Sequence, residues 1–150
     1  MKRHVIIFVS LAFLIASCNG QNISKHKVPS LILNTLKAKY PLANDVDWKK
    51  HGNLYEAELD IKDSVEISVL IDDAGKLIMQ KQDVPVRALT PGIATTIKNQ
   101  YKDYTVDDVE KIEKNGTIYY QVELEAKNKK EVNLVFLPDG REEKEISFWD

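Results

Sequence analysis

The chain has 150 residues and a formal net charge of −2 at pH 7, from 21 basic and 23 acidic side chains. This length suits one domain, and the charge, which forms no basic stripe, excludes nucleic acid as an expected partner. One cysteine excludes an internal disulfide, and three histidines provide neither a zinc cluster nor a plausible Ser/His/Asp triad. We therefore expect no catalytic residues, no metal and no cofactor.

The first 17 residues are typical of an export signal. Lys2 and Arg3 precede an apolar run over residues 5–15, which is shorter than the roughly 20 residues that a membrane-spanning helix needs. Residues 15–18, Ile-Ala-Ser-Cys, resemble a bacterial lipobox. We predict that Cys18 is lipidated and anchors the protein in the cell envelope, facing the periplasm or in the outer membrane. Ordinary cleavage nearby, which leaves a soluble periplasmic protein, is the alternative.

Residues 18–27 are polar and carry no regular pattern. We expect them to be a flexible tether, of which nine residues reach roughly 15–18 Å. Such a tether would hold a folded domain just off the membrane.

The rest of the chain contains an internal repeat, in residues 28–82 and 89–149. Helical positions correspond at an offset of 61, as Ile32 does to Ile93, and strand positions at an offset of 65, as Ile67 does to Val132. Since half of the chain would bury too little surface alone, we expect the two repeats to pack as one domain.

Each repeat is expected to contain one helix followed by about four antiparallel strands. Apolar residues recur every three to four positions in the helices and every second position in the strands. Thr90 and Pro91 are a good cap and first residue for the second helix. In chain order, the expected elements are a helix at 29–40, strands at 46–50, 54–61, 65–71 and 77–83, a helix at 91–101, and strands at 109–114, 118–124, 132–136 and 142–149.

These features resemble the PepSY-like family, which includes beta-lactamase-inhibitor-like periplasmic proteins of Bacteroidota. The resemblance rests on the tandem order, on Tyr40-Pro41 at the end of the first helix, and on the Asp73-Ala74-Gly75-Lys76 turn. It implies an α+β fold in which two tandem helix-plus-four-stranded-antiparallel-sheet repeats form a two-layer α/β sandwich (BLIP-like). It implies no catalytic residues. The second repeat departs from the pattern with Lys102 where the first has Pro41.

Two local patterns suggest chemistry but have simpler interpretations. His51 precedes Gly52-Asn53, so we expect it to be a solvated histidine in a turn. Residues 72–76, Asp-Asp-Ala-Gly-Lys, lack the alternating oxygen ligands and the later Glu of a calcium loop, and are expected to be a hairpin turn.

Apolar residues recur at matching points on the strand faces that point away from the helices. The corresponding pairs are Leu54 with Tyr119 and Leu70 with Val135. One interpretation is that these faces meet each other or twist into the core; the other is an exposed strip that binds a protein or peptide. Trp149 could anchor such a partner as well, because tryptophan is enriched at binding hot spots.

The sequence therefore favours a non-enzymatic, membrane-tethered periplasmic module that binds a protein or peptide. One alternative, from the family resemblance, is an inhibitor of a secreted peptidase or beta-lactamase. Another is a structural or stress-related envelope lipoprotein.

Overall fold

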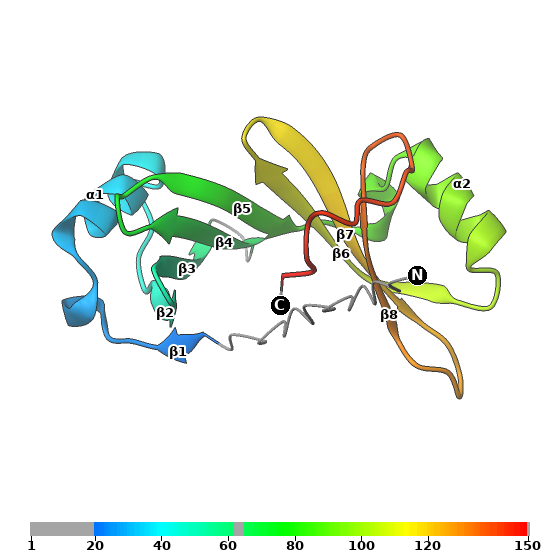
Figure 1. Cartoon of the computed structure of the whole chain (residues 1–150), viewed down its shortest axis with the longest axis horizontal. Helices are drawn as coiled ribbons and strands as arrows, with labels where there is room; N and C mark the ends of the chain where they lie inside the picture. The colour runs from blue at the N-terminus through cyan, green and yellow to red at the C-terminus, as the bar shows by residue number, and fades with distance from the viewer. Residues whose placement is uncertain (1–19, 62–64, 150) are drawn as a thin grey trace, which may run out of the picture.

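The computed structural model describes residues 20–61 and 65–149. Over these residues, eight antiparallel strands form one continuous sheet in the order β1 to β8, so that each strand pairs with its neighbours in sequence (Figure 1). The elements are β1 (Gln21–Asn22), η1 (Lys25–Lys27), α1 (Ser30–Lys39), β2 (Asp47–His51), β3 (Leu54–Ile61), β4 (Val65–Asp72), β5 (Leu77–Asp83), η2 (Val86–Ala88), α2 (Pro91–Gln100), β6 (Thr105–Lys114), β7 (Thr117–Glu125) and β8 (Val132–Phe136).

The α+β fold with two repeated segments is confirmed. Thr90 caps α2 as predicted, because its hydroxyl oxygen accepts a hydrogen bond from the Ile93 amide at 3.3 Å. Both helices end one residue before a tyrosine, Tyr40 or Tyr101. The repeats lie side by side, joined by antiparallel pairing between β5 and β6.

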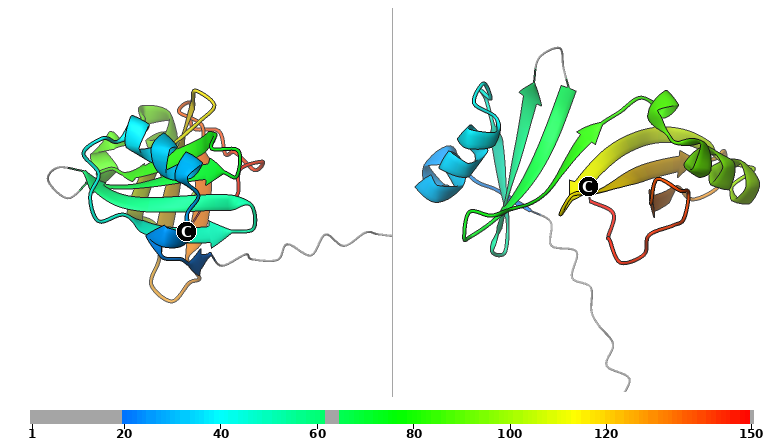
Figure 2. Two further views of the ribbon diagram at one scale, coloured as in Figure 1. Left: turned by 90° about the vertical axis from the view of Figure 1, so that its left-hand side faces the viewer. Right: turned by 90° about the horizontal axis from the view of Figure 1, so that it is seen from above.

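Both helices lie on the same face of the sheet. Val69, in the core under α1, pairs with Gln80, which in turn pairs with Glu113. Side chains alternate along a strand, so Val109, four positions before Glu113, lies on that same face, where it packs in the core with α2. On this face the helices sit at opposite ends of the molecule, and each packs on its own half of the sheet (Figure 2).

Each helix packs on a hydrophobic core of its own. Under α1 the core is centred on Ile32, Ala57, Val69 and Ile71, and under α2 on residues that include Ile93, Val122, Leu124 and Phe136. All eight of these side chains have 0% exposure. Ile32 is equivalent to Ile93, and Ile71 to Phe136. Equivalent positions of the two repeats therefore lie in the two cores.

Both helices are held to a hairpin turn by the same contact. The Thr35 hydroxyl of α1 donates to the Gly75 carbonyl at 2.8 Å, and the Thr96 hydroxyl of α2 donates to the Gly140 carbonyl at 2.8 Å. The two glycines have φ values of +78° and +93°, which L side chains rarely adopt. The predicted hairpin turn at residues 72–76 is confirmed.

The predicted tether is largely part of the folded domain. Gln21 and Asn22 pair with β2, and the Ile23 amide donates to the Trp48 carbonyl at 2.9 Å. Ile23 also packs against the first core. Burial of this side chain offsets part of the conformational entropy that the polar segment loses when it is ordered. The predicted signal and Cys18 lie outside the described residues. No helix within residues 20–61 and 65–149 is long and apolar enough to cross a membrane.

The prediction of a strand at residues 142–149 is wrong except at Glu142 and Glu143, which still bond to β8. Glu142 forms an isolated bridge with Phe136, and the Glu143 amide donates to the Val135 carbonyl at 2.7 Å. Beyond this point the chain leaves the sheet edge. It runs back toward the middle of the molecule (Figures 1 and 2).

Candidate binding face

The side of the sheet that carries no α-helix is the candidate functional site, and we call it the helix-free face. The strand register places three rows of side chains across it. The rows are Glu56–Leu70–Met79–Lys114, Ser68–Lys81–Ile112–Tyr119, and Asp83–Glu110–Gln121–Val135. Each row mixes charged and apolar groups.

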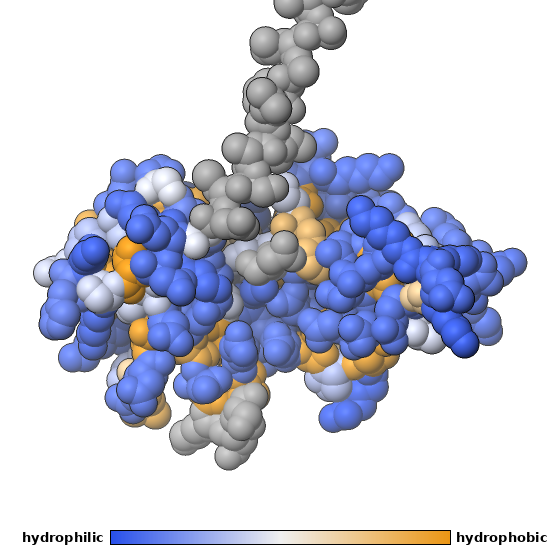
Figure 3. All heavy atoms as spheres, turned by 90° about the horizontal axis from the view of Figure 1, so that it is seen from below, coloured by the Kyte–Doolittle hydropathy of each residue, from blue (hydrophilic) through white to orange (hydrophobic). Residues whose placement is uncertain are grey.

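The structure separates the five predicted site residues into two groups. Leu54 and Tyr119 are half-buried, whereas Leu70, Val135 and Trp149 are 7%, 5% and 9% exposed. The burial of Leu70 and Val135 corrects the idea that all of these residues form one exposed strip. Neither of these two residues belongs to the core under α1 or the core under α2. Seen from below, hydrophobic side chains form separate patches in a largely hydrophilic surface (Figure 3).

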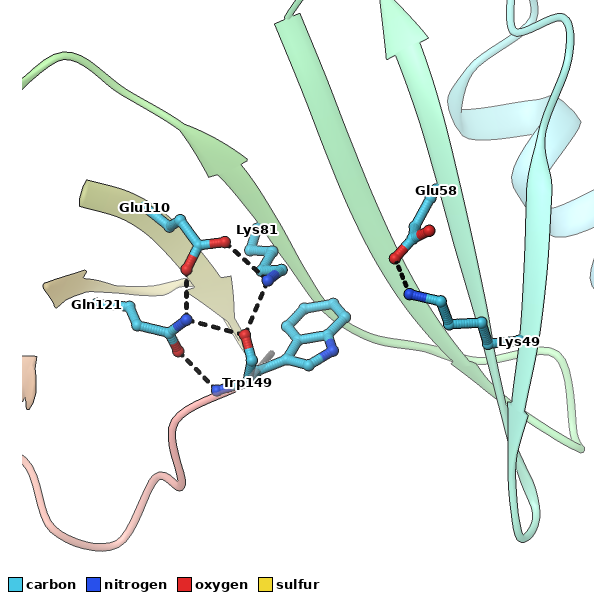
Figure 4. Close-up of polar contacts among 6 residues, drawn as sticks. All are labelled: Lys49, Glu58, Lys81, Glu110, Gln121 and Trp149. Atoms are coloured by element: carbon cyan, nitrogen blue, oxygen red, sulfur yellow. Dashed lines mark hydrogen bonds and ion pairs between the residues drawn. The ribbon is translucent and has the colours of Figure 1, made fainter. Parts of the chain in front are cut away.

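Trp149 lies on the helix-free face and is held there through its backbone (Figure 4). Its amide donates to Gln121 Oε1 at 2.8 Å, and its carbonyl accepts from Gln121 Nε2 at 2.8 Å. The Lys81 ammonium donates to the same carbonyl at 2.8 Å and lies 5.3 Å from the centroid of the indole ring. The side chain of Gln121 thus pairs with Trp149 much as a neighbouring strand would.

A buried ion pair lies next to these contacts. Lys81 Nζ is 2.7 Å from Glu110 Oε1, and the side chains are 12% and 11% exposed. Gln121 Nε2 also donates to the other Glu110 oxygen. Lys81, Glu110, Gln121 and the Trp149 backbone therefore form one connected network in which each buried polar group has a partner.

The first repeat presents a more exposed pair on the same face. Lys49 and Glu58 form an ion pair with side chains 32% and 27% exposed, and this contact is separate from Trp149 (Figure 4). The hydrogen bond to Glu58 raises the pKa of Lys49 above its usual value. This half of the face is therefore charged and accessible to water.

The prediction that His51 is a solvated histidine in a turn is also wrong. His51 Nε2 lies 2.5 Å from Glu56 Oε2, and the Glu56 side chain is only 1% exposed. The backbone of Gly20 leaves no room for a Cβ, which would lie 2.3 Å from the ring of His51. His51 is therefore packed between the incoming chain and the helix-free face. The other Glu56 oxygen, Oε1, is buried without a hydrogen-bond partner.

Carboxylates gather at one end of the sheet. A pocket of about 210 Å³ is lined by Asp45, Asp47, Glu58, Leu59, Asp60 and Glu66. Burial, and next the charge of Asp83, raises the pKa of Glu66; burial, and next Asp108, raises that of Asp83. Within residues 20–61 and 65–149, no three His, Cys, Asp or Glu side chains are arranged to hold a metal ion.

Sequence reasoning missed Lys81, Glu110 and Gln121. Alternation correctly puts them on the face away from the helices, where polar side chains are expected to be solvated. They are buried because residues 143–149 fold back over this face. No local sequence pattern predicts that path of the chain. The available signal in the sequence was the apolar Val135, at a strand position that faces away from the helices, together with the aromatic Trp149.

Two repeated segments, each with a helix packed on one antiparallel sheet, make this an α+β protein of tandem repeats. Residues 13–79 and 79–141 each match the family described as "Putative beta-lactamase-inhibitor-like, PepSY-like". The two matches cover most of the sequence, and the chain belongs to this family.

Solved structures agree with this fold. The chain is similar to a DUF2874 family protein from Bacteroides uniformis, with a TM-score of 0.71, 21% identity, and coverage of 78% of this chain and 87% of that chain. It is similar to a BLIP-like protein from Bacteroides fragilis, with a TM-score of 0.64, 26% identity, and coverage of 77% and 83%. A Bacteroides eggerthii protein described as a putative periplasmic protein gives a TM-score of 0.71, 16% identity, and coverage of 78% and 86%. A comparison with curated proteins gave no match.

Proposed function

We propose that this chain is a non-enzymatic module of the cell envelope that binds a protein or peptide on its helix-free face. The observation that carries the proposal is that, on this face, Lys81 and Gln121 already bind the backbone of Trp149, while Glu110 contacts both of these side chains. The family description and the periplasmic description of the Bacteroides eggerthii relative support this proposal.

The accessible residues of the face supply the test. Leu54 and Tyr119 are half-buried, so replacing both with Glu adds charge to the face with little effect on either core. Leu42, which is 74% exposed on the loop after α1, supplies the matched control, Leu42→Glu.

Cross-linking in cells followed by mass spectrometry measures the outcome. We expect wild type and Leu42→Glu to capture the same envelope protein, and the Leu54→Glu/Tyr119→Glu variant to lose it while its circular dichroism is unchanged. Equal capture by all three proteins would contradict the use of this face.

An inhibitor of a secreted beta-lactamase or peptidase is the second candidate. It is favoured by the family description and by the BLIP-like relative from Bacteroides fragilis. Purified protein at micromolar concentration should then slow at least one such enzyme, and the Leu54→Glu/Tyr119→Glu variant should not. The absence of inhibition across both classes removes this candidate and leaves the binding proposal intact.

We also propose that Cys18 is the lipid anchor. The support is the lipobox-like Ile-Ala-Ser-Cys of residues 15–18 after an apolar run. Wild type should fractionate with membranes and carry an acyl mass on Cys18, and Cys18→Ala should lose both. A mature protein without acyl chains would contradict the anchor.

A further inference from the structure

The segment formed by residues 143–149, which we call the closing segment, is attached to the sheet at two points. The Glu143 amide donates to Val135 at its start, and Trp149 contacts Gln121 and Lys81 at its end. Within the described part of the chain, residues 144–148 form no hydrogen bond to the sheet; the Glu145 amide bonds only to Glu143. Release of Trp149 would therefore leave Glu143 as the one described hydrogen-bonded attachment of the segment to the sheet.

The contacts that hold Trp149 are of a kind that another peptide can make. Gln121 binds the backbone amide and carbonyl, which every residue except proline provides. Lys81 binds the same carbonyl and lies over the ring, which requires only an aromatic side chain. These contacts recognise an aromatic residue in an extended backbone rather than this segment in particular.

The surface beneath Trp149 differs from a hydrophobic core. Trp149 belongs to neither of the two core clusters. It contacts Lys81 and Gln121, which form the buried network with Glu110. Their cross-strand neighbours on this face are apolar: Ile112 is 0% exposed and Val135 is 5% exposed. Water can solvate the polar groups when the segment leaves, and the apolar neighbours favour an aromatic side chain in its place.

We propose that the platform of Lys81, Glu110 and Gln121 is a peptide-binding site for an extended segment that carries an aromatic residue. The closing segment occupies this site in cis and competes with the partner. This inference rests on the proposed function and names the chemistry of its partner.

The test uses the full-length protein and a fluorescein-labelled peptide of residues 143–149. Trp149→Ala removes the indole ring that Lys81 contacts, and so weakens the hold of the closing segment on the site without shortening the protein. The peptide should bind this variant with a micromolar Kd and bind wild type at least about tenfold more weakly. A peptide in which the tryptophan is alanine should bind neither protein.

Two double variants localise the binding. Adding Gln121→Ala to Trp149→Ala should weaken the peptide about tenfold or more, because the amide pairing is lost. Adding Glu58→Gln instead changes the other half of the helix-free face and should leave the affinity unchanged. Circular dichroism and thermal unfolding check that each variant is folded.

A second measurement does not depend on the variants. In wild type, excess unlabelled peptide should shift the indole N–H signal of Trp149 in the NMR spectrum and leave that of Trp48, in the first core, in place. Equal peptide affinity for wild type and Trp149→Ala, or no binding and no shift, would overturn the proposal. So would a wild-type dimer that Trp149→Ala dissociates, since the segment would then be exchanged between copies. None of these outcomes alters the cross-linking test of the proposed function.

Discussion

The two repeats share their core contacts but end differently. Thr35 holds Gly75 in the first and Thr96 holds Gly140 in the second, through equivalent hydrogen bonds of 2.8 Å. After its hairpin turn the first repeat continues as β5, which pairs with β4 and β6. After Gly140 the described part of the second repeat has an isolated bridge at Glu142 and the Glu143–Val135 hydrogen bond in place of a strand.

The neighbouring strand explains this difference. In the first repeat β5 has hydrogen-bond partners on both sides, because β6 continues the sheet. In the second repeat no further strand follows among the described residues, so the corresponding segment would be an edge strand with half of its backbone unpaired. The chain instead crosses the helix-free face, where Gln121 and Lys81 bind Trp149. One sequence pattern thus gives a strand inside the sheet and a closing segment at its end.

The largest expected effects come from the equivalent core residues Ile71 and Phe136, both 0% exposed. Phe136→Ala should lower the free energy of unfolding by about 3–5 kcal/mol and Ile71→Ala by about 2–5 kcal/mol, because each leaves a cavity. Urea unfolding measures both. A loss below about 1 kcal/mol for either would mean that the two cores are not equally packed.

The next comparison is between the two lysines of the helix-free face. Lys81→Ala leaves the buried Glu110 carboxylate without its opposite charge, removes one of the two donors to the Trp149 carbonyl, and should cost about 3 kcal/mol. Lys49→Ala breaks a half-exposed pair and should cost about 0–1 kcal/mol. Chemical denaturation of the two variants in parallel measures the difference. Equal losses would show that the closing segment adds nothing to the stability of the second half.

The turn glycines provide a third comparison. A Cβ on Gly140 would lie 2.5 Å from the backbone carbonyl carbon of Gly92, whereas one on Gly75 would lie 2.7 Å from Cγ of the Leu31 side chain. Both alanine variants suffer from the positive φ, by about 1–2 kcal/mol. Gly140→Ala should lose more, because backbone cannot move aside as a side chain can. A lower Tm for Gly75→Ala than for Gly140→Ala would reverse this ranking.

The smallest effect concerns the tyrosines that follow the helices. Burial, and then the hydrogen bond to Glu142, raises the pKa of Tyr101 to about 12. Because this folded pKa lies above the unfolded value near 10, the associated stability is present below pH 10 and is lost as the pH rises toward 12. Tyr101→Phe should therefore lose less stability than wild type over that range in thermal unfolding. Absorbance at alkaline pH should show a tyrosine that titrates late and is missing in Tyr101→Phe.

Much of the fold could be predicted because it depends on local periodicity. The two helices and the strands β2 to β5, β7 and β8 agree with the expected pattern to within about two residues, whereas β6 begins at Thr105, four residues before the expected start. Three features could not be predicted in this way. Residues 21–23 join the sheet, His51 packs against Glu56, and Trp149 covers the helix-free face. Each of these depends on a partner distant in sequence, about which a polar or isolated residue carries no information.

The sequence by itself determined the repeat, its two cores and the face on which each strand residue lies. These properties follow from the helical and strand periods, which any segment shows without reference to the rest of the chain. Only the tertiary structure decided which side chains of the helix-free face are buried. Glu110 and Gln121 have the polar character of solvated strand residues, and they became an interior network because residues 143–149 end the sheet by folding across it.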